Sequence, residues 1–379
     1  MITVVADQHI YKLNEVIPES VNLITFDAED GFPREVEQAD ALLIRTVSRV
    51  DRSTLQLANT KLRFVGTASA GYDHIDTDYL QEHNVAFGHS PGCNANSVAE
   101  YITTSLLIWA EKTWVPLKDI CVGIIGYGNV GGATARFLES LGVEYRTYDP
   151  PREMREGSAG YRSASAGEVL SCDVLTFHTP LTFNGEHPTY HWLDSSKLGS
   201  RRYRLIINAA RGGIIDEQAL RVHLDNGNLE QYILDVWEHE PLFSRNMVQG
   251  ALFATPHIAG YSLEAKNNAT RQVAEAMARV LGIDSIGKLR TPIKEINEPS
   301  SYDNYNSLCH LLSTVHPISS YDRQLRQLSQ QILSDRELAV GFNRLRTLTE
   351  LRHEFQSIHL SKNLFDRYPI LNRLGFKQA

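Results

Sequence analysis

Short apolar runs separated by polar, turn-forming stretches recur along most of the chain. In the first hundred residues, a β-rich start at residues 1–7 is followed by apolar runs at residues 21–26, 41–44 and 62–67. Continuous apolar runs of this length are typical of parallel strands that are buried on both faces. This part of the chain is therefore predicted to form a small α/β sheet.

A long apolar segment separates this region from the rest of the chain. A turn cluster at residues 91–96 precedes residues 97–114, which predict one helix with Asn94 or Asn96 as its N-cap. A helix this apolar must be buried on most of its surface. We therefore expect a second domain to begin near residue 97.

A second series of apolar strands follows Pro116. The expected strands are residues 121–125, 144–148, 174–177, 205–209, 232–236 and 251–254. Strands that alternate with helices imply βαβ units and an open parallel sheet. An amphipathic helix is expected at residues 264–281, and a polar connector at residues 291–305. Helix-like segments follow at residues 324–333 and 344–355.

Composition and charge narrow the class of protein. The 379 residues are 42% hydrophobic and 22% charged, which is ordinary for two or three globular domains and excludes disordered or fibrous chains. The net charge of −8 argues against sequence-independent binding to nucleic acid or anionic membranes. Residues 290–379 carry 12 Lys and Arg against 9 Asp and Glu, whereas the preceding residues carry 25 against 36. This change from a net negative to a net positive charge near residue 290 predicts a separate C-terminal unit.

Neither membrane insertion nor export is predicted. The most apolar stretch, residues 102–110, lies between Glu100 and Glu111 and is too short to span a bilayer. The first seven residues lack a basic leader. The four cysteines have neither zinc-ligand nor redox spacing: Cys93, Cys121, Cys172 and Cys309. We therefore expect buried, reduced thiols and a cytoplasmic protein.

Residues 126–131 carry the glycine pattern GYGNVG between a predicted strand and a helix at residues 133–141. Asp149 stands at the end of the next strand. This combination is typical of a dinucleotide site, because the glycines allow a tight turn near a pyrophosphate, the helix N-terminus attracts phosphates, and the acid accepts hydrogen bonds from a ribose. The carboxylate favours NAD over NADP, a preference that Arg152 and Arg155 would soften.

Three later strands carry polar residues to one edge of the expected sheet. Arg211 follows the first strand and His257 follows the last. Asp235, Glu238 and Glu240 belong to the strand between them or follow it. Ligands of open parallel sheets bind at this edge. A histidine exchanges a hydroxyl proton, a carboxylate stabilises the imidazolium, and an arginine binds a substrate carboxylate. The set predicts a hydride-transfer site.

Together these motifs resemble the NAD-dependent D-2-hydroxyacid dehydrogenases. The matching stretches follow the family's order between about residues 41 and 261: the glycine loop and residues 208–212, 234–241 and 255–260. The resemblance implies a Rossmann-type doubly wound parallel sheet that binds NAD and a second, flavodoxin-like α/β substrate domain. It also implies no metal.

The resemblance assigns a role to each matched residue. Arg211 is the expected catalytic arginine, His257 the acid/base, and Glu240 the partner of the histidine. The expected cofactor contacts are Gly126, Gly128, Asn129, Val130, Gly131, Asp149, Thr179, Ala209, Ala210, Asp235 and Gly260. The expected substrate contacts are Thr46, Thr67, Ser69, Ala70, Gly71 and Tyr261. Within this set, Asp235 is expected to meet the nicotinamide carboxamide.

Within the family, the chain is most similar to the branch that oxidises 4-phospho-D-erythronate at its 2-hydroxyl during pyridoxal phosphate biosynthesis. The stretches that carry this likeness are residues 45–47, 65–71, 91–95, 149–152 and 257–261. At position 46, where this branch often has Ser, the chain has Thr and keeps the hydroxyl.

The branch has a small C-terminal α+β dimerisation domain. The resemblance therefore implies a homodimer with a substrate domain at residues 1–96 and 261–286, an NAD-binding domain at 97–260 and a dimerisation domain at 287–379. The substrate phosphate requires cations. Arg45 beside Thr46, and Arg344 or Arg346 in the basic C-terminal region, are candidates on charge placement.

The sequence leaves alternatives open. A related enzyme acting on 3-phosphoglycerate, glycerate or glyoxylate would carry the same motifs. A non-catalytic, NAD-sensing corepressor is also compatible, because some such proteins keep the Arg–Glu–His set. A glycine-loop methyltransferase would not require that set. Turnover separates the first two classes, since a sensor binds NAD without oxidising any acid, whereas an enzyme generates NADH.

Overall fold

The computed structural model describes residues 1–295 and 308–379, which form two compact units. The first unit comprises Met1–Asn94 with Ser262–Pro292, and the second comprises Ala95–Tyr261 with Ile293–Ala379. The predicted division makes residues 287–379 a third domain, whereas residues 293–379 belong here to the second unit. The three-domain division stays a prediction. Most of the predicted connector at residues 291–305 lies outside the described residues.

The first unit is built on a five-stranded parallel sheet in the order β2-β1-β3-β4-β5, which is the strand order of flavodoxin. Its strands are β1 (Ile2–Asp7), β2 (Val21–Phe26), β3 (Ala41–Ile44), β4 (Phe64–Thr67) and β5 (Ala86–Gly88). Three of the predicted strands match β2, β3 and most of β4. The expectation of a small α/β sheet is confirmed.

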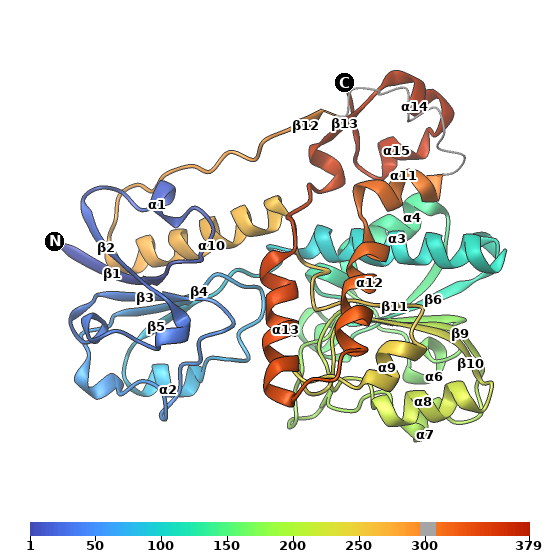
Figure 1. The fold of residues 1–379 in the computed structure, drawn as a ribbon, viewed down its shortest axis with the longest axis horizontal. Coiled ribbons are helices and arrows are strands. Elements are labelled where there is room, and N and C mark those ends of the chain that lie inside the picture. The colour runs from blue at the N-terminus through green and yellow to red at the C-terminus, as the bar shows by residue number, and fades with distance from the viewer. Residues whose placement is uncertain (296–307) are drawn as a thin grey trace. The chain divides into compact units, whose positions relative to one another are not determined.

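Helices cover both faces of this sheet (Figure 1). The helix α10 (Leu263–Leu281) packs Val273 and Met277 against Phe64 on one face, next to the short α1 (Leu13–Val16). The helix α2 (Thr77–Glu82) lies on the other face. Gly66 of β4 permits the close approach of α10, because a Cβ there would lie 2.6 Å from the Val273 side chain.

The second unit contains a six-stranded parallel sheet in the order β11-β10-β9-β8-β6-β7. Its strands are β6 (Cys121–Ile125), β7 (Glu144–Tyr148), β8 (Val174–Phe177), β9 (Tyr203–Asn208), β10 (Leu229–Leu234) and β11 (Phe253–Ala254). The first three coincide with the predicted strands. The strand order reverses between β6 and β8, which is where open α/β sheets bind ligands.

Helices lie on both faces of this sheet as well (Figure 1). One face is covered by α3 (Ala95–Thr113) and α4 (Asn129–Leu141). The other carries α6 (Ala166–Val169), α7 (Ser195–Leu198), α8 (Glu217–Asp225) and α9 (Arg245–Gly250), and α5 (Pro150–Glu156) follows β7. The alternating pattern of strands and helices thus gives the predicted Rossmann-type sheet.

The expected helix after the turn cluster is α3, and most of its residues are buried as predicted. Its predicted cap is wrong. Asn96 lies inside the helix, and the buried side-chain oxygen of Asn94 accepts no hydrogen bond from any described residue.

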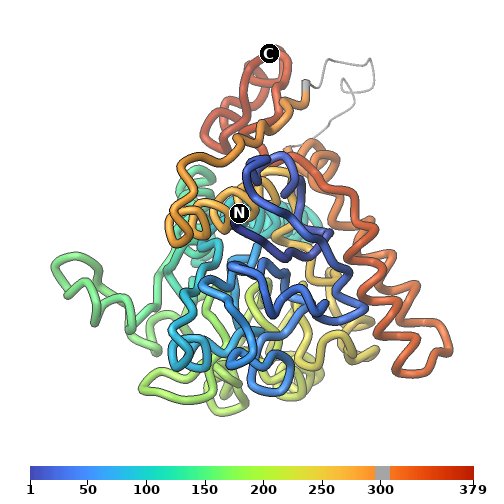
Figure 2. Tube along the Cα trace, turned by 90° about the vertical axis from the view of Figure 1, so that its left-hand side faces the viewer, coloured from blue at the N-terminus to red at the C-terminus, as the bar shows by residue number. Residues whose placement is uncertain are grey.

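The C-terminal region belongs to the second unit but has a small core of its own. Its helices are α11 (Leu308–Val315), α12 (Ile318–Ser329), α13 (Asp335–Leu348), α14 (Lys362–Arg367) and α15 (Ile370–Arg373). A three-stranded parallel sheet joins β12 (Lys294–Glu295), β13 (Ile358–Leu360) and β14 (Lys377–Gln378). Figure 2 shows α12 and α13 side by side.

Both of these long helices begin earlier than predicted. A capping box at Ser334 and Glu337 starts α13 well before the predicted helix at residue 344. Pro317 marks the start of α12. Throughout residues 1–295 and 308–379, no helix combines the length and apolar character needed to cross a membrane.

Candidate active site

The structure gathers the predicted cofactor residues at one edge of the six-stranded sheet. Gly126 follows β6, Thr179 lies two residues beyond β8, and Asp235 follows β10. The remaining predicted cofactor residues also follow strands or begin α4: Gly128, Asn129, Val130, Gly131, Asp149, Ala209, Ala210 and Gly260. Because all six strands are parallel, their carboxyl ends share this edge.

The glycine loop has the tight geometry that a dinucleotide site requires. Gly126 has a φ of +92°, which favours glycine. A Cβ on Gly131 would lie 2.0 Å from the carbonyl oxygen of Gly126, so α4 packs directly against the loop. A Cβ on Gly128 would meet no atom within 4 Å, which leaves open space above the loop. The first turn of α4 therefore has room for a phosphate.

Asp149 holds this loop in place. Its Oδ2 accepts a hydrogen bond from the backbone N–H of Tyr127 (2.8 Å), and its Oδ1 caps α5 by accepting from the N–H of Arg152 (2.9 Å). A carboxylate has about four acceptor positions, so it retains capacity for ribose hydroxyls. The Arg152 guanidinium lies over the Tyr127 ring and donates to the Tyr127 carbonyl oxygen and to Glu156.

Two polar atoms beyond β8 fit a bound dinucleotide. The Thr179 hydroxyl and the Nδ1 of His178 are buried and have no hydrogen-bond partner among the described residues. Burial lowers the pKa of His178 to about 3, so this side chain is neutral. Buried polar groups in folded proteins are normally paired. Together with the open glycine loop, these two atoms show that the residues present fit NAD.

His257 is paired with the predicted carboxylate. Its Nδ1 lies 2.7 Å from the Oε2 of Glu240, and the Oε1 of Glu240 accepts from the N–H of Trp237 (2.9 Å). Burial raises the pKa of Glu240, but the charge of His257, these hydrogen bonds and the charge of Arg346 outweigh it, so the net pKa is lowered. Because Glu240 stays ionised, it fixes the proton on Nδ1 and leaves Nε2 to exchange a proton.

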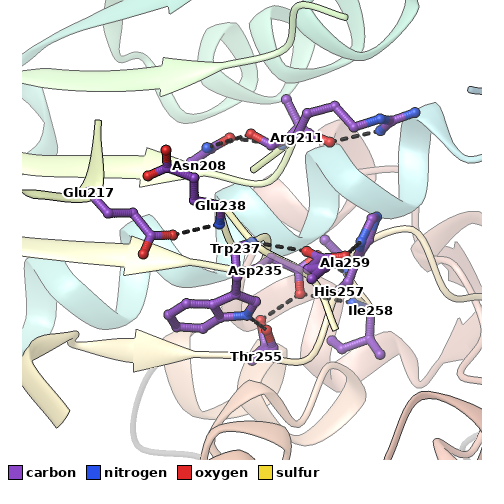
Figure 3. A network of polar contacts seen from close by, with 12 residues as sticks. Asn208, Arg211, Glu217, Asp235, Trp237, Glu238, Thr255, His257, Ile258 and Ala259 are labelled. Atoms are coloured by element: carbon purple, nitrogen blue, oxygen red, sulfur yellow. Dashed lines mark hydrogen bonds and ion pairs between the residues drawn. The ribbon is translucent and has the colours of Figure 1, made fainter. Parts of the chain in front are cut away.

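Asp235 organises the segment that bears His257 (Figure 3). Its Oδ1 accepts from the Thr255 hydroxyl (2.6 Å) and the N–H of Ile258 (2.8 Å), and its Oδ2 accepts from the N–H of Ala259 (2.9 Å). Burial raises the pKa of Asp235 despite these bonds and the charge of His257. The hydrogen bonds hold His257 in a left-handed conformation with a φ of +56°.

Tyr101 of α3 extends this network and was missed by the sequence analysis. Its hydroxyl lies 2.8 Å from the Thr255 hydroxyl, and both residues are fully buried. Ser97, one turn earlier on the same helix, donates to the carbonyl oxygen of Ala259 (2.9 Å). The helix thus supports residues 255–259 at two points. No local sequence signal identifies Tyr101, because an apolar helix with a tyrosine is an ordinary core element.

The loop that bears Arg211 is fixed against the next loop (Figure 3). The Asn208 side chain donates to the carbonyl oxygen of Arg211 (2.9 Å), and the Arg211 guanidinium donates to the carbonyl oxygen of Ala210 (2.8 Å). A Cβ on Gly212 would lie 1.8 Å from the carbonyl oxygen of Trp237, so only glycine permits this contact. The loops that bear Arg211 and Glu240 are therefore in direct contact.

A second His–Glu pair joins the loop after β10 to the segment between β8 and α7. Glu238 contacts the Nε2 of His191 at 2.7 Å through its Oε1, and its N–H donates to the Oε1 of Glu217 (2.8 Å). Burial, together with the charges of Glu238, Glu240 and Asp216, raises the pKa of Glu217 to about 7. The structure thus assigns Glu240 to His257 and Glu238 to His191. Neither His191 nor Glu217 has a recognisable sequence signal.

The predicted substrate residues of the first unit lie at the carboxyl ends of β3 and β4. Arg45 follows β3, and its Nε lies 3.0 Å from the Oδ2 of the buried Asp7. Thr67 ends β4, and its hydroxyl contacts the hydroxyl of Ser69 (2.8 Å) and the Nε2 of His74 (3.0 Å). The remaining residues of this group follow the same strands: Thr46, Ala70 and Gly71.

Tyr261 belongs to the second unit, where its N–H donates to the carbonyl oxygen of Ile258. The predicted substrate residues are thus distributed over both units. Their roles stay predictions.

Comparisons with known proteins agree with this geometry. A model of the D-isomer specific 2-hydroxyacid dehydrogenase NAD-binding domain matches residues 107–259. Proteins named erythronate-4-phosphate dehydrogenase from Marinobacter nauticus and Proteus mirabilis are 38% and 36% identical to this chain. The first alignment covers 99% of both chains, and the second covers 90% of both.

Solved structures share the fold at low sequence identity. An NAD-dependent formate dehydrogenase from Staphylococcus aureus in complex with NAD is 22% identical, with a TM-score of 0.57 over 77% of this chain and 100% of that one. The TT0316 protein from Thermus thermophilus is 22% identical, with a TM-score of 0.59 over 75% of this chain and 99% of that one.

The sheet, its glycine loop and the paired His257 and Glu240 define the class of protein as an NAD-dependent dehydrogenase of D-2-hydroxy acids. Within that class, the chain belongs to the erythronate-4-phosphate dehydrogenase family, since relatives with this name match it over nearly its whole length.

Proposed function

We propose that this protein catalyses the NAD-dependent oxidation of 4-phospho-D-erythronate to (R)-3-hydroxy-2-oxo-4-phosphobutanoate in pyridoxal phosphate biosynthesis. The substrate is supported by the 38% identity to a protein named for it across 99% of both chains. The chemistry is carried by one observation, the 2.7 Å contact between the Nδ1 of His257 and the Oε2 of Glu240.

In the proposed mechanism, His257, Glu240 and Arg211 each have a separate role. Bound NAD supplies the acceptor for the hydride that leaves C2 of the substrate. His257 accepts the proton of the 2-hydroxyl at its Nε2, because Glu240 holds the other ring proton at Nδ1. The ionised Glu240 stabilises the imidazolium that results. Arg211 binds the substrate carboxylate and the developing carbonyl oxygen.

NAD is held, in this proposal, by the glycine loop, Asp149 and Thr179 of the second unit. Of the predicted substrate contacts, Thr46, Thr67 and the segment 69–71 bind the carboxylate side of the substrate, together with Tyr261. These roles rest on the resemblance to the family and, for all of these residues except Tyr261, on a position at or after a strand's carboxyl end.

We assign the phosphate group of the substrate to Arg346. Phe342 of α13 packs against Phe243 (5.7 Å between ring centroids), which in turn packs against Trp237 of the loop after β10 (5.9 Å). Arg346 lies one helical turn after Phe342 and its charge lowers the pKa of Glu240. Its Nε is buried without a hydrogen-bond partner among the described residues. Arg344, in contrast, is exposed.

The arginine assignment is tested by substrate kinetics. Replacing Arg346 by Met is expected to raise the KM for 4-phospho-D-erythronate about tenfold or more, because a charge-assisted contact to the phosphate is lost. Arg344→Met on the same helix is the matched control and leaves the KM unchanged. An unchanged KM in the Arg346 variant would remove this residue from the phosphate site. Arg45→Ala tests the other candidate, whose guanidinium is already paired with Asp7.

The proposed reaction is tested by NADH absorbance. Purified protein, NAD and 4-phospho-D-erythronate are mixed, and a parallel reaction contains a 2-oxo acid with direct assay of the products. Phosphorylated product in either reaction, with unphosphorylated erythronate inert, supports the proposal. Absence of product in both reactions, while NAD still binds, contradicts the proposed reaction. It favours another acid, such as 3-phosphoglycerate, glycerate or glyoxylate, as the substrate. Absence of turnover with every acid tested favours an NAD-sensing corepressor.

We also propose that the protein is a cytoplasmic homodimer that associates through its C-terminal region. The support is the resemblance to the branch with a dimerisation domain. Light scattering of the purified protein tests the assembly, and a mass equal to one chain at micromolar concentration contradicts it.

A further inference from the structure

Two cysteines that are 51 positions apart in the chain are neighbours in the second unit. Cys121 opens β6, Cys172 lies just before β8, and their sulfur atoms are 3.2 Å apart. A disulfide has a sulfur–sulfur distance of about 2 Å, so the two atoms need to approach by only about 1 Å. This pair was not expected from the sequence, because the spacing of the two residues along the chain gives no redox motif.

The backbone around the two thiols is held in register. The N–H of Asp173 donates to the carbonyl oxygen of Cys121 (3.0 Å), and the N–H of Cys121 donates to the Oδ2 of Asp173 (2.9 Å). The parallel pairing of Val122 with Val174 continues this frame into the sheet. The two sulfur atoms are therefore close to one another on backbone segments that hydrogen bonds already join.

The two thiols differ in their exposure and in their pKa. Cys121 is partly exposed, contrary to the expectation of a buried thiol, whereas Cys172 is 2% exposed. The hydrogen bond between the two sulfur atoms and the charge of Arg146 lower the pKa of Cys121, although burial and the charges of Glu144 and Asp173 oppose them. The bond with Cys121 and burial raise the pKa of Cys172. Cys121 is thus the nucleophile and Cys172 the resolving thiol.

We propose that Cys121 and Cys172 are a site of reversible oxidation, at which a peroxide converts the two thiols to an intramolecular disulfide. The Cys121 thiolate attacks hydrogen peroxide and becomes a sulfenic acid while the O–O bond breaks and one water leaves. The sulfur of Cys172 then attacks the sulfur of Cys121, the S–S bond forms as the S–O bond breaks, and the hydroxide leaves with the thiol proton of Cys172 as a second water. The peroxide is reduced by the two electrons that the thiols lose, and an added dithiol reduces the disulfide back to two thiols while it is itself oxidised.

The position of the pair determines what the disulfide does. It lies at the amino ends of β6 and β8, whereas the glycine loop and Thr179 follow their carboxyl ends. The cross-link therefore joins the two strands that carry the cofactor residues without touching that edge. It also closes a loop of about 50 residues, which restricts the unfolded chain. We expect NAD affinity to be unchanged and the Tm to rise by about 5 °C.

The test is peptide mapping of the intact protein after treatment with hydrogen peroxide, with all free thiols alkylated in denaturant before any reductant is added. The expected result is one cross-linked peptide containing Cys121 and Cys172, with Cys93 and Cys309 still alkylated, and its loss after dithiothreitol. Cys172→Ser is expected to stop at a sulfenic acid on Cys121 that dimedone traps. Cys93→Ser, which changes another buried thiol, is the matched control and keeps the cross-link.

Two outcomes overturn the inference. One is the recovery of all four alkylated cysteines at peroxide levels that oxidise a free thiol in solution. The other is oxidation of Cys121 to a sulfinic acid in the unmodified sequence without the cross-linked peptide. Both are read on the wild-type protein, so the conclusion does not depend on whether the serine variants fold. Neither depends on the proposed substrate.

Discussion

At the scale of single residues, two carboxylates on the loop after β10 serve two different histidines. Glu240 pairs with His257, and Glu238 pairs with His191. Replacing Glu240 by Gln removes the charge that stabilises the imidazolium and fixes the proton on Nδ1. We expect kcat to fall by about 10²–10⁴-fold with little change in KM. Glu238→Gln is the matched control, with kcat within about threefold of wild type. Equal losses in the two variants would contradict the assignment.

Glu217 gives the stability of the fold a pH dependence. Its pKa is raised to about 7 by burial and by the charges of Glu238, Glu240 and Asp216, whereas an ordinary glutamate has a pKa of 4.5. Between these values the folded state binds more protons than the unfolded state, so the free energy of unfolding falls as the pH rises and levels off above about 7.

The variant Glu217→Gln has no such titration and still accepts the hydrogen bond from Glu238. Relative to wild type, we expect it to gain about 2–3 kcal/mol of unfolding free energy between pH 5 and pH 8. Urea unfolding at both pH values measures this gain. A difference between the proteins that is the same at pH 5 and pH 8 would refute the raised pKa.

The residues whose position in the fold the sequence predicted share one property. Arg211, Asp149 and His257 each follow an apolar run, so strand geometry alone carries them to one edge of the sheet. His191 and Glu217 lie in a loop and at a helix start, and they join the site through contacts with Glu238. The local pattern of apolar and polar residues therefore predicts where Arg211, Asp149 and His257 lie. The positions of His191 and Glu217 depend instead on how loops that are distant in the sequence pack together.

At the scale of elements, the Tyr101 hydroxyl of α3 supports the segment 255–259, which bears His257. Tyr101→Phe removes the contact with Thr255, which in turn bonds Asp235. We expect kcat to fall about three- to tenfold and the free energy of unfolding to fall by about 1 kcal/mol. Tyr79→Phe is the matched control, because this buried hydroxyl donates to Leu55 and lies in the first unit. A similar loss of stability with normal kcat is expected there.

Element boundaries were predictable where a strand is bounded by turn residues, as for β6, β7 and β8. They were not predictable for α12, whose position depends on contacts with distant segments. Arg326 donates to the carbonyl oxygens of Val248 and Ala251, and Asp322 accepts from the N–H of Ala254. These bonds satisfy the backbone around β11, so tertiary contacts outweigh the local pattern.

At the scale of the molecule, the C-terminal region is part of the second unit through a buried ion pair. Arg352 bonds Glu100 of α3, and its Nη2 also donates to the carbonyl oxygen (2.9 Å) and the hydroxyl (3.0 Å) of Ser97. The other oxygen of Glu100 accepts from the N–H of Phe355 (2.7 Å). Burial raises the pKa of Glu100, whereas the charge of Arg352 lowers it and favours the ionised carboxylate. The stability of this buried ion pair therefore depends on both side chains, Arg352 and Glu100.

This dependence predicts non-additive effects of mutation. Arg352→Met leaves Glu100 buried without its cation and is expected to cost about 3–5 kcal/mol of unfolding free energy. The double variant with Glu100→Gln removes both charges and keeps an acceptor for Phe355, so it is expected to recover more than half of that loss. Arg52→Met, which breaks an exposed pair with Glu82, is the control and leaves the urea midpoint unchanged. A double variant no more stable than the Arg352 single variant would show that packing, and not charge pairing, joins the C-terminal region to α3.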